Sequence, residues 1–111
     1  MDLEIQPSLI ADALLTEAQV RKALAKLIRV IERLGEQGLR SHKGIHLHRI
    51  QNQSDPVSGL PLESMELTRS ARVKCMVKGH CLVLISLHTD HDETYKKIKN
   101  VLATDSADFH G

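Results

Sequence analysis

The chain has 111 residues, with 15 Lys and Arg against 14 Asp and Glu, so its formal net charge is +1. Roughly 100 residues support one core and leave no room for a second domain. An apolar content of 41% with 26% charged residues excludes a disordered chain, and the near-zero charge excludes a protein that is basic throughout. A polyanion would therefore bind only where cations are segregated from anions.

The cysteine content and the first residues indicate a reducing compartment. Disulfide frameworks in short secreted chains use more than the two Cys present here. The acidic stretch 1–6 differs from the basic start of a secretory signal, and no apolar run approaches the roughly 20 residues that span a bilayer. We expect a cytoplasmic protein with no membrane partner.

The chain begins with a predicted strand. Polar and apolar residues alternate over 2–6, which is the period of a strand with one covered face. Pro7 ends this strand because proline has no N–H to donate. Residues 8–15 (Ser-Leu-Ile-Ala-Asp-Ala-Leu-Leu) fit either a short helix or an apolar connection docked on the core.

A long amphipathic helix is predicted over 16–37. Thr16 and Gln19 have the spacing of a capping box, which satisfies free N–H groups of a first turn. Gly38 offers a C-terminal stop. The apolar residues recur at intervals of three and four, so they form one core-facing stripe. This stripe consists of Val20, Leu24, Leu27, Ile31 and Leu34.

Three further strands are predicted in the second half. Residues 44–51 alternate, with Ile45 and Leu47 on one face and His46, His48 and Ile50 on the other. Residues 52–61 gather turn formers, which predicts a long, mobile loop. The runs 65–78 and 80–88 are rich in strand formers, and Gly79 joins them as a hairpin.

The acidic segment 89–93 then opens a second predicted helix, with Tyr95, Ile98 and Leu102 on one side. The predicted architecture is a two-layer α/β (α+β) domain of order β-α-β-β-β-α, in which a four-stranded sheet carries two helices on one face. A single domain would cover 1–103, followed by a polar, disordered tail at 104–111.

Cations gather on one face of each predicted helix, whereas most acidic residues lie elsewhere, and only Glu32 and Glu36 accompany the cations late in the first helix. On the first helix the cations recur about 200° around from the apolar stripe. A solvent-exposed helix face also explains charged residues, but exposure to solvent alone would favour Glu as much as Lys or Arg. Segregated cations bind phosphate backbones, so we predict RNA binding. The predicted RNA-binding residues are Lys22, Lys26, Arg29, Arg33, Lys96, Lys97 and Lys99.

Three stretches resemble the ribosome hibernation-promoting factors and the related ribosome-associated inhibitors. They are residues 1–6 as the opening strand, residues 15–18 (Leu-Thr-Glu-Ala) opening the basic helix, and residues 71–102, where Asp90-His91-Asp92 leads into Glu93-Thr94-Tyr95-Lys96-Lys97-Ile98. The resemblance implies a non-catalytic, stress-related protein. Its helices would bind ribosomal RNA of the small subunit and silence translation without a cofactor.

A protein-interaction module of the same fold is the alternative of a different class. It would no longer bind ribosomes. Its partner would be a protein, recruited through the loop 51–68 or through the open face of the sheet. The open-face residues are His46, His48, Ile50, Lys74 and Met76.

Two other constellations favour simpler interpretations. His46 and His48, followed by Tyr95, resemble the metal-binding pair and the nucleophilic tyrosine of rolling-circle replication initiators. That resemblance implies a metal-dependent single-strand nuclease. However, a chain with seven His often contains such a pair by chance. Cys75 and Cys81 lie farther apart than paired zinc ligands, and two small buried side chains explain them better. We therefore expect no metal site and no enzyme.

Overall fold

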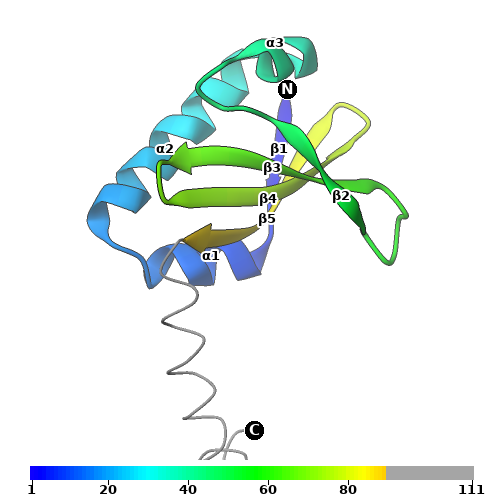
Figure 1. The fold of residues 1–111 in the computed structure, drawn as a ribbon. Helices are drawn as coiled ribbons and strands as arrows, with labels where there is room; N and C mark the ends of the chain where they lie inside the picture. Colours follow the sequence, from blue (N-terminus) through cyan, green and yellow to red (C-terminus); the bar gives the residue numbers. More distant parts are fainter. Residues whose placement is uncertain (90–111) are drawn as a thin grey trace, which may run out of the picture.

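A five-stranded sheet with helices on one face forms the described part of the computed structural model, residues 1–89 (Figure 1). The strand order is β1-β5-β4-β3-β2, with β1 parallel to β5 and every other neighbouring pair antiparallel. The predicted two-layer α+β class is confirmed. The elements of residues 1–89 are β1 (Asp2–Ile5), α1 (Pro7–Leu14), α2 (Ala18–Arg33), α3 (Glu36–Ser41), β2 (His48–Ser54), β3 (Pro61–Thr68), β4 (Ala71–Lys78) and β5 (Cys81–Thr89).

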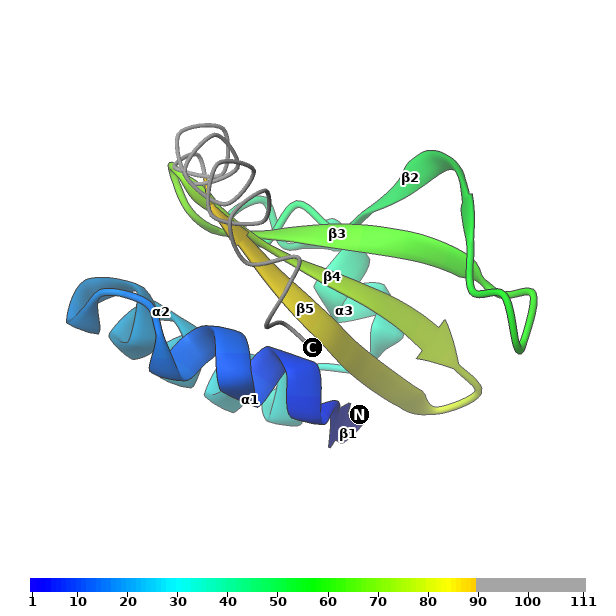
Figure 2. The ribbon, with the colours of Figure 1, turned by 90° about the horizontal axis from the view of Figure 1, so that it is seen from below.

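The segment left open by the sequence, 8–15, is the short helix α1. Pro7 occupies its first turn, where a missing N–H costs no hydrogen bond and the fixed φ suits a helix. Leu9, only 1% exposed, anchors α1 in the core. Figure 2 shows α1 and α2 together on one side of the sheet, so the helical layer begins directly after β1.

Helix α2 buries four of the five residues of the predicted stripe, Val20, Leu24, Leu27 and Ile31. The predicted end at Gly38 is wrong, because the chain becomes extended at Leu34 and restarts as α3 at Glu36. The capping box is also wrong. Thr16 Oγ1 donates to Ala13 O over 2.9 Å and so closes the end of α1, while the residue before α2, Glu17, makes no side-chain cap.

The predicted strand 65–78 is two strands, which is why the sheet has five strands and not four. β3 ends at Thr68 and β4 begins at Ala71, and these two residues pair across a tight turn. The turn contains neither glycine nor proline, so the sequence does not indicate a turn at this point. Gly79, with φ +62°, makes the predicted hairpin between β4 and β5.

The predicted long loop at 52–61 is mostly a hairpin. β2 runs through Ser54 and β3 starts at Pro61. The turn between them is closed by Asp55 Oδ2, which accepts from the Ser58 backbone N–H over 2.8 Å. The alternation over 44–51 correctly predicted that Ile45 and Leu47 are buried, although the strand itself starts only at His48.

The second predicted helix, with Tyr95 and the tail 104–111, lies outside the described residues, and the domain boundary at 103 stays a prediction. Within residues 1–89 no helix is long and apolar enough to cross a membrane. The observed order therefore differs from the predicted one by two short helices around α2 and by the additional strand.

The two cysteines differ in environment, which makes a testable difference in reactivity. Both thiols are free; Cys75 is buried and Cys81 is half-buried. Burial raises the pKa of the Cys75 thiol to about 12, so the nucleophilic thiolate is scarce there.

We expect iodoacetamide at pH 8 to modify only Cys81 in the native protein, and to modify both thiols in urea. Mass spectrometry of tryptic peptides measures both sites. Equal native rates for Cys75 and Cys81 would show that β4 opens readily.

Candidate functional site

A row of ionisable side chains runs across three strands of the sheet, on the face turned away from α1 and α2. Directly paired residues of antiparallel strands project to the same face. Glu66 of β3 pairs with Arg72 of β4, and Arg72 pairs in turn with His88 of β5. With strands about 4.8 Å apart, this row places a guanidinium between a carboxylate and an imidazole.

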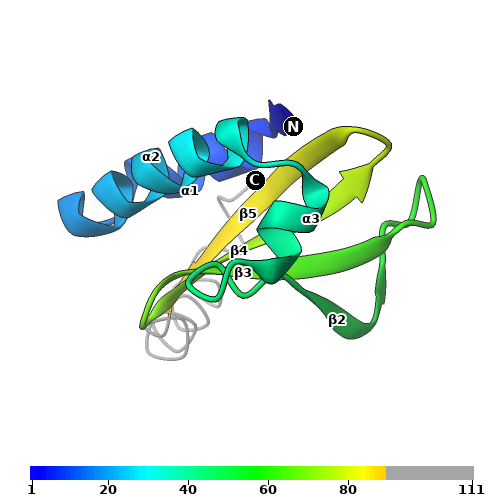
Figure 3. The same cartoon turned by 90° about the horizontal axis from the view of Figure 1, so that it is seen from above.

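A second polar row lies about 7 Å farther along the same strands. It runs across four strands, since His48 pairs with Ser64, Ser64 with Lys74, and Lys74 with Ser86. The alternate residues of β4, Val73 and Cys75, are fully buried in the core beneath the helices. The two rows therefore belong to the opposite face of the sheet, which we term the open face; Figures 2 and 3 show α1 and α2 together on the other side.

His46 joins this surface from the segment before β2. Its Nδ1 lies 3.4 Å from Glu66 Oε1, and its ring centroid lies 4.7 Å from that of His48. Its backbone has φ +52°, a conformation that is uncommon for a non-glycine residue and that clusters at functional sites. Burial of the neighbours Ile45 and Leu47 holds this turn in place.

The two rows and His46 form what we term the open-face cluster. Ser86 Oγ and His88 Nε2 are 2.8 Å apart, so these two members are hydrogen-bonded to each other. Glu66 and His46 are exposed, which leaves them accessible to a ligand. The chemically active members of the cluster are His46, His48, Glu66, Arg72, Lys74, Ser86 and His88.

The cluster combines proton-transfer groups with anion-binding groups. Carboxylate and imidazole side chains act as general bases and acids. Arginine binds a phosphate through two parallel N–H groups, and lysine binds it as a point charge. Among residues 1–89 no group of His, Cys, Asp and Glu side chains forms a candidate metal site. The arrangement fits acid–base chemistry on a phosphodiester.

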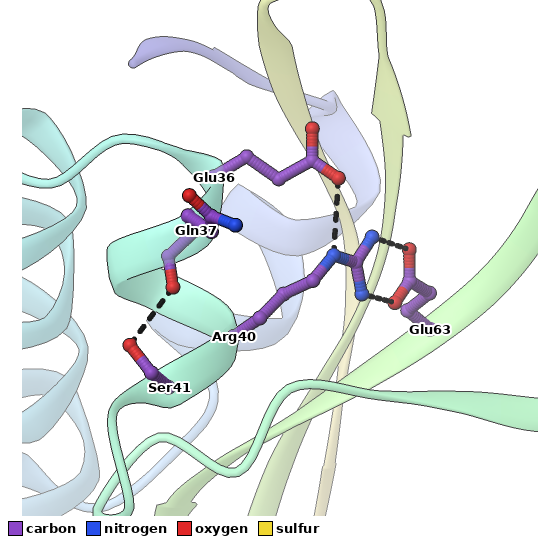
Figure 4. Close-up of polar contacts among 5 residues, drawn as sticks. All are labelled: Glu36, Gln37, Arg40, Ser41 and Glu63. Atoms are coloured by element: carbon purple, nitrogen blue, oxygen red, sulfur yellow. Dashed lines mark hydrogen bonds and ion pairs between the residues drawn. The ribbon is translucent and has the colours of Figure 1, made fainter.

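An ion pair between α3 and the sheet supports β3 from the opposite face (Figure 4). Arg40 Nη1 and Nη2 donate to Glu63 Oε1 and Oε2 over 2.7 and 3.0 Å, and Arg40 Nε donates to Glu36 Oε2 over 3.0 Å. The hydrogen bonds to Glu63 raise the pKa of Arg40 above its ordinary high value. Glu63, 1% exposed, lies three residues before Glu66 on the same strand.

A hollow of about 570 Å³ lies where β2 diverges from β3, beside residues 49–54. Arg49 is the ionisable side chain of its lining, and the rest is amide, hydroxyl, apolar or glycine. The hollow therefore lacks the paired acid and base that the open-face cluster has.

The predicted RNA-binding residues lie apart from the cluster. The four on α2 are exposed, on the side of the helix opposite to the stripe that packs on the sheet. Lys22, Lys26, Arg29 and Arg33 therefore share one surface, which we term the α2 stripe. Lys96, Lys97 and Lys99 lie outside the described residues.

Sequence reasoning placed three cluster members on an open sheet face: His46, His48 and Lys74. Met76, expected there too, is buried, and Ser58 Oγ lies 4.0 Å from its sulfur. Glu66, Arg72, Ser86 and His88 were missed as site residues. The alternation of Arg72 with buried Val73 was a usable signal, but the cross-strand partners depend on a register that no local pattern contains.

Known proteins with this arrangement of elements were found among solved structures. The archaeal RelE–RelB complex of Pyrococcus horikoshii OT3 is 12% identical, with 80% of this chain and 93% of that chain covered and a TM-score of 0.60. The chain has a RelE-like fold. No family model and no curated sequence matches it.

Two further structures agree. The RelB–RelE antitoxin–toxin complex of Methanococcus jannaschii is 8% identical, covers 85% of this chain and 96% of that chain, and has a TM-score of 0.61. YafQ of E. coli BL21(DE3) is 17% identical, covers 83% and 96%, and has a TM-score of 0.58.

These findings overturn the hibernation-factor hypothesis. The structures named above are of the RelE and YafQ type and are not hibernation factors. The prediction that the protein is not an enzyme is also wrong. The prediction of a non-catalytic factor that silences the ribosome is wrong for the same reason. The interaction module derived from the same family is not favoured either. Short motifs misled because strand-helix-strand order is shared by several two-layer folds.

Proposed function

We propose that the chain is the toxin of a toxin–antitoxin pair and that it cleaves RNA at the open-face cluster. The observation that carries the proposal is the row formed by Glu66, Arg72 and His88 on three adjacent strands. The RelE-like fold supports it, since RelE and YafQ are found in complexes with the antitoxins RelB and DinJ.

The row suits cleavage by the ribose 2′-hydroxyl. Glu66 accepts the 2′-OH proton, and the 2′ oxygen attacks phosphorus while the bond to the 5′ oxygen breaks. His88, as the general acid, gives a proton to that leaving oxygen. The products are a 2′,3′-cyclic phosphate and a 5′-hydroxyl. His46, 3.4 Å from Glu66, orients the carboxylate.

Two cations stabilise the charge that develops during this step. Arg72, between base and acid, faces the phosphate whose oxygens gain negative charge. Lys74 lies on the same strand one pleat repeat away and faces the phosphate of the neighbouring nucleotide. The exposed position of the cluster suits a single RNA strand laid across the open sheet.

The decisive experiment uses an mRNA in a reconstituted translation reaction. Purified protein should cut it and leave 2′,3′-cyclic phosphate ends. An mRNA with one 2′-deoxynucleotide at the mapped site should resist cutting there, because the nucleophile is missing. Two results would favour the tyrosine nuclease instead. One is cutting of the deoxy substrate as fast as the unmodified mRNA, and the other is loss of cutting in Tyr95→Phe while variants of the open-face cluster remain active.

We further propose that the α2 stripe binds ribosomal RNA in the cytoplasm while the open face holds mRNA. The two surfaces lie on opposite layers, so both can be occupied at once. Each phosphate contact contributes about 0.7 to 0.9 to the slope of log K against log salt.

The double variant Lys26→Glu/Arg29→Glu should reduce ribosome co-sedimentation at least tenfold at 100 mM salt, and lower the salt slope by about 2. Lys43→Glu/Lys78→Glu, with the same change of charge away from α2, should bind as the wild type does. Equal loss in both pairs would mean that net charge, and not the stripe, governs binding.

A further inference from the structure

A β-bulge determines which residues of β5 reach the open face. Cys75 pairs with Leu84, whereas the preceding residue, Lys74, pairs with Ser86, so Ile85 is an extra residue in β5. Strict alternation from the buried Leu84 would turn residues 86 and 88 toward the helices. The extra residue reverses this, because a one-residue shift moves every later side chain to the other face. Ser86 and His88 owe their position in the cluster to the bulge.

Helix α1 holds both sides of this bulge. β1 pairs with β5 only from Cys81 to Leu84, and α1 runs along β5 beyond that point (Figure 1). Ser8 Oγ donates to the Ile85 carbonyl over 2.6 Å, and Asp12 Oδ2 accepts from the Leu87 N–H over 3.1 Å.

The spacing of the two side chains matches the span of the bulge. Ser8 and Asp12 are four residues apart, so they share one face of α1. Leu9, buried beside them, fixes the helix against the core. The two hydrogen bonds join segments separated by 77 and 75 residues, and they satisfy one backbone acceptor and one donor that flank Ser86.

We propose that Ser8 and Asp12 are positioning residues, which hold the β5 bulge and thereby direct Ser86 and His88 into the cluster. The inference rests on the proposed function for its effect on catalysis, and on the hydrogen bonds alone for its effect on structure. Neither residue touches the RNA. Loss of their bonds should displace the acid without removing the cations that hold the substrate.

The experiment compares Asp12→Ala with Asp12→Asn in the full-length chain. The alanine variant should lower kcat about 10- to 100-fold with KM changed less than about threefold, since small misplacements of a catalytic group have effects of this size. The asparagine variant should recover most of the kcat, because its amide oxygen accepts from Leu87 N–H. Ser8→Ala, which removes one bond and leaves Asp12, should fall between wild type and Asp12→Ala.

A structural measurement separates this inference from the proposed function. In Asp12→Ala the Leu87 amide should exchange with solvent faster, and the NMR signals of Leu87 and His88 should move, whether or not RNA is cleaved. Asp55→Ala is the matched control, since it removes a carboxylate that accepts from the Ser58 N–H over 2.8 Å in the turn between β2 and β3. Unchanged His88 signals in Asp12→Ala, or failure of Asp12→Asn to restore kcat, would overturn the proposal.

Discussion

Replacing Arg72 with alanine should lower kcat/KM for RNA cleavage about 10²- to 10³-fold, the effect typical of removing one group that stabilises transition-state charge. Arg72 is paired with Glu66 on one side and His88 on the other, so no other described residue occupies its place between acid and base. Lys74 cannot replace it, because Lys74 belongs to the next row of the cluster.

The chemistry of arginine refines this expectation. Arg72→Lys retains the charge but loses the planar pair of donors, so we expect an activity between those of wild type and Arg72→Ala. The assay is single-turnover cleavage of a labelled mRNA bound to ribosomes.

Arg49→Ala is the matched control for Arg72→Ala. Arg49 pairs with Glu63, whose side chain is buried on the helix side of the sheet, so Arg49 lies on the face opposite to the cluster. Its loss should change kcat/KM less than about threefold, which is within the range of weak surface effects. Equal losses in Arg49→Ala and Arg72→Ala would argue against a site centred on the row of Glu66, Arg72 and His88.

Replacing Arg40 with leucine should lower the free energy of unfolding by about 3 kcal/mol, because removing one partner of a buried ion pair leaves the other charge without compensation. Glu63 is 1% exposed and accepts both of its side-chain hydrogen bonds from Arg40. The Arg40 side chain is 36% exposed, so in the variant water can partly solvate the Glu63 carboxylate. The expected loss of stability is therefore near the lower end of the range for buried ion pairs. Urea unfolding followed by circular dichroism measures the change.

Two variants isolate the cause of this loss. Arg40→Leu/Glu63→Leu should recover most of the stability, because two apolar side chains leave no buried charge. Glu36→Gln removes only the exposed partner of Arg40 and should change stability by less than about 1 kcal/mol. If the double variant is as unstable as Arg40→Leu, packing of α3 rather than the uncompensated carboxylate accounts for the effect.

The pH dependence of the pair follows from the direction of its pKa shift. Pairing raises the pKa of Arg40, so the stability that Arg40 contributes is present at every pH below its ordinary value and is lost only as the pH rises through the raised one. In the wild-type protein Arg40 should therefore contribute the same stability at pH 7 and pH 9.

Local patterns in the sequence were sufficient for the layers of the fold. The three- and four-residue spacing from Val20 to Ile31 predicted the buried side of α2, since a helix repeats every 3.6 residues wherever it lies. Alternation predicted that Ile45 and Leu47 are buried, and Gly79 predicted the β4–β5 hairpin through its tolerance of positive φ. These features depend on neighbours in the chain, which the sequence displays directly.

The site depended on contacts that the chain makes over long distances. Glu66, Arg72 and His88 come together through strand register, and the faces of Ser86 and His88 are set by an extra residue at Ile85. Ser8 and Asp12 reach that bulge from the opposite end of the described chain. By itself the sequence determined the α+β class, the core side of α2 and the segregation of cations. Only the tertiary structure decided which polar residues share the open face, because register and bulges are settled by packing between strands and not by residues adjacent in the chain.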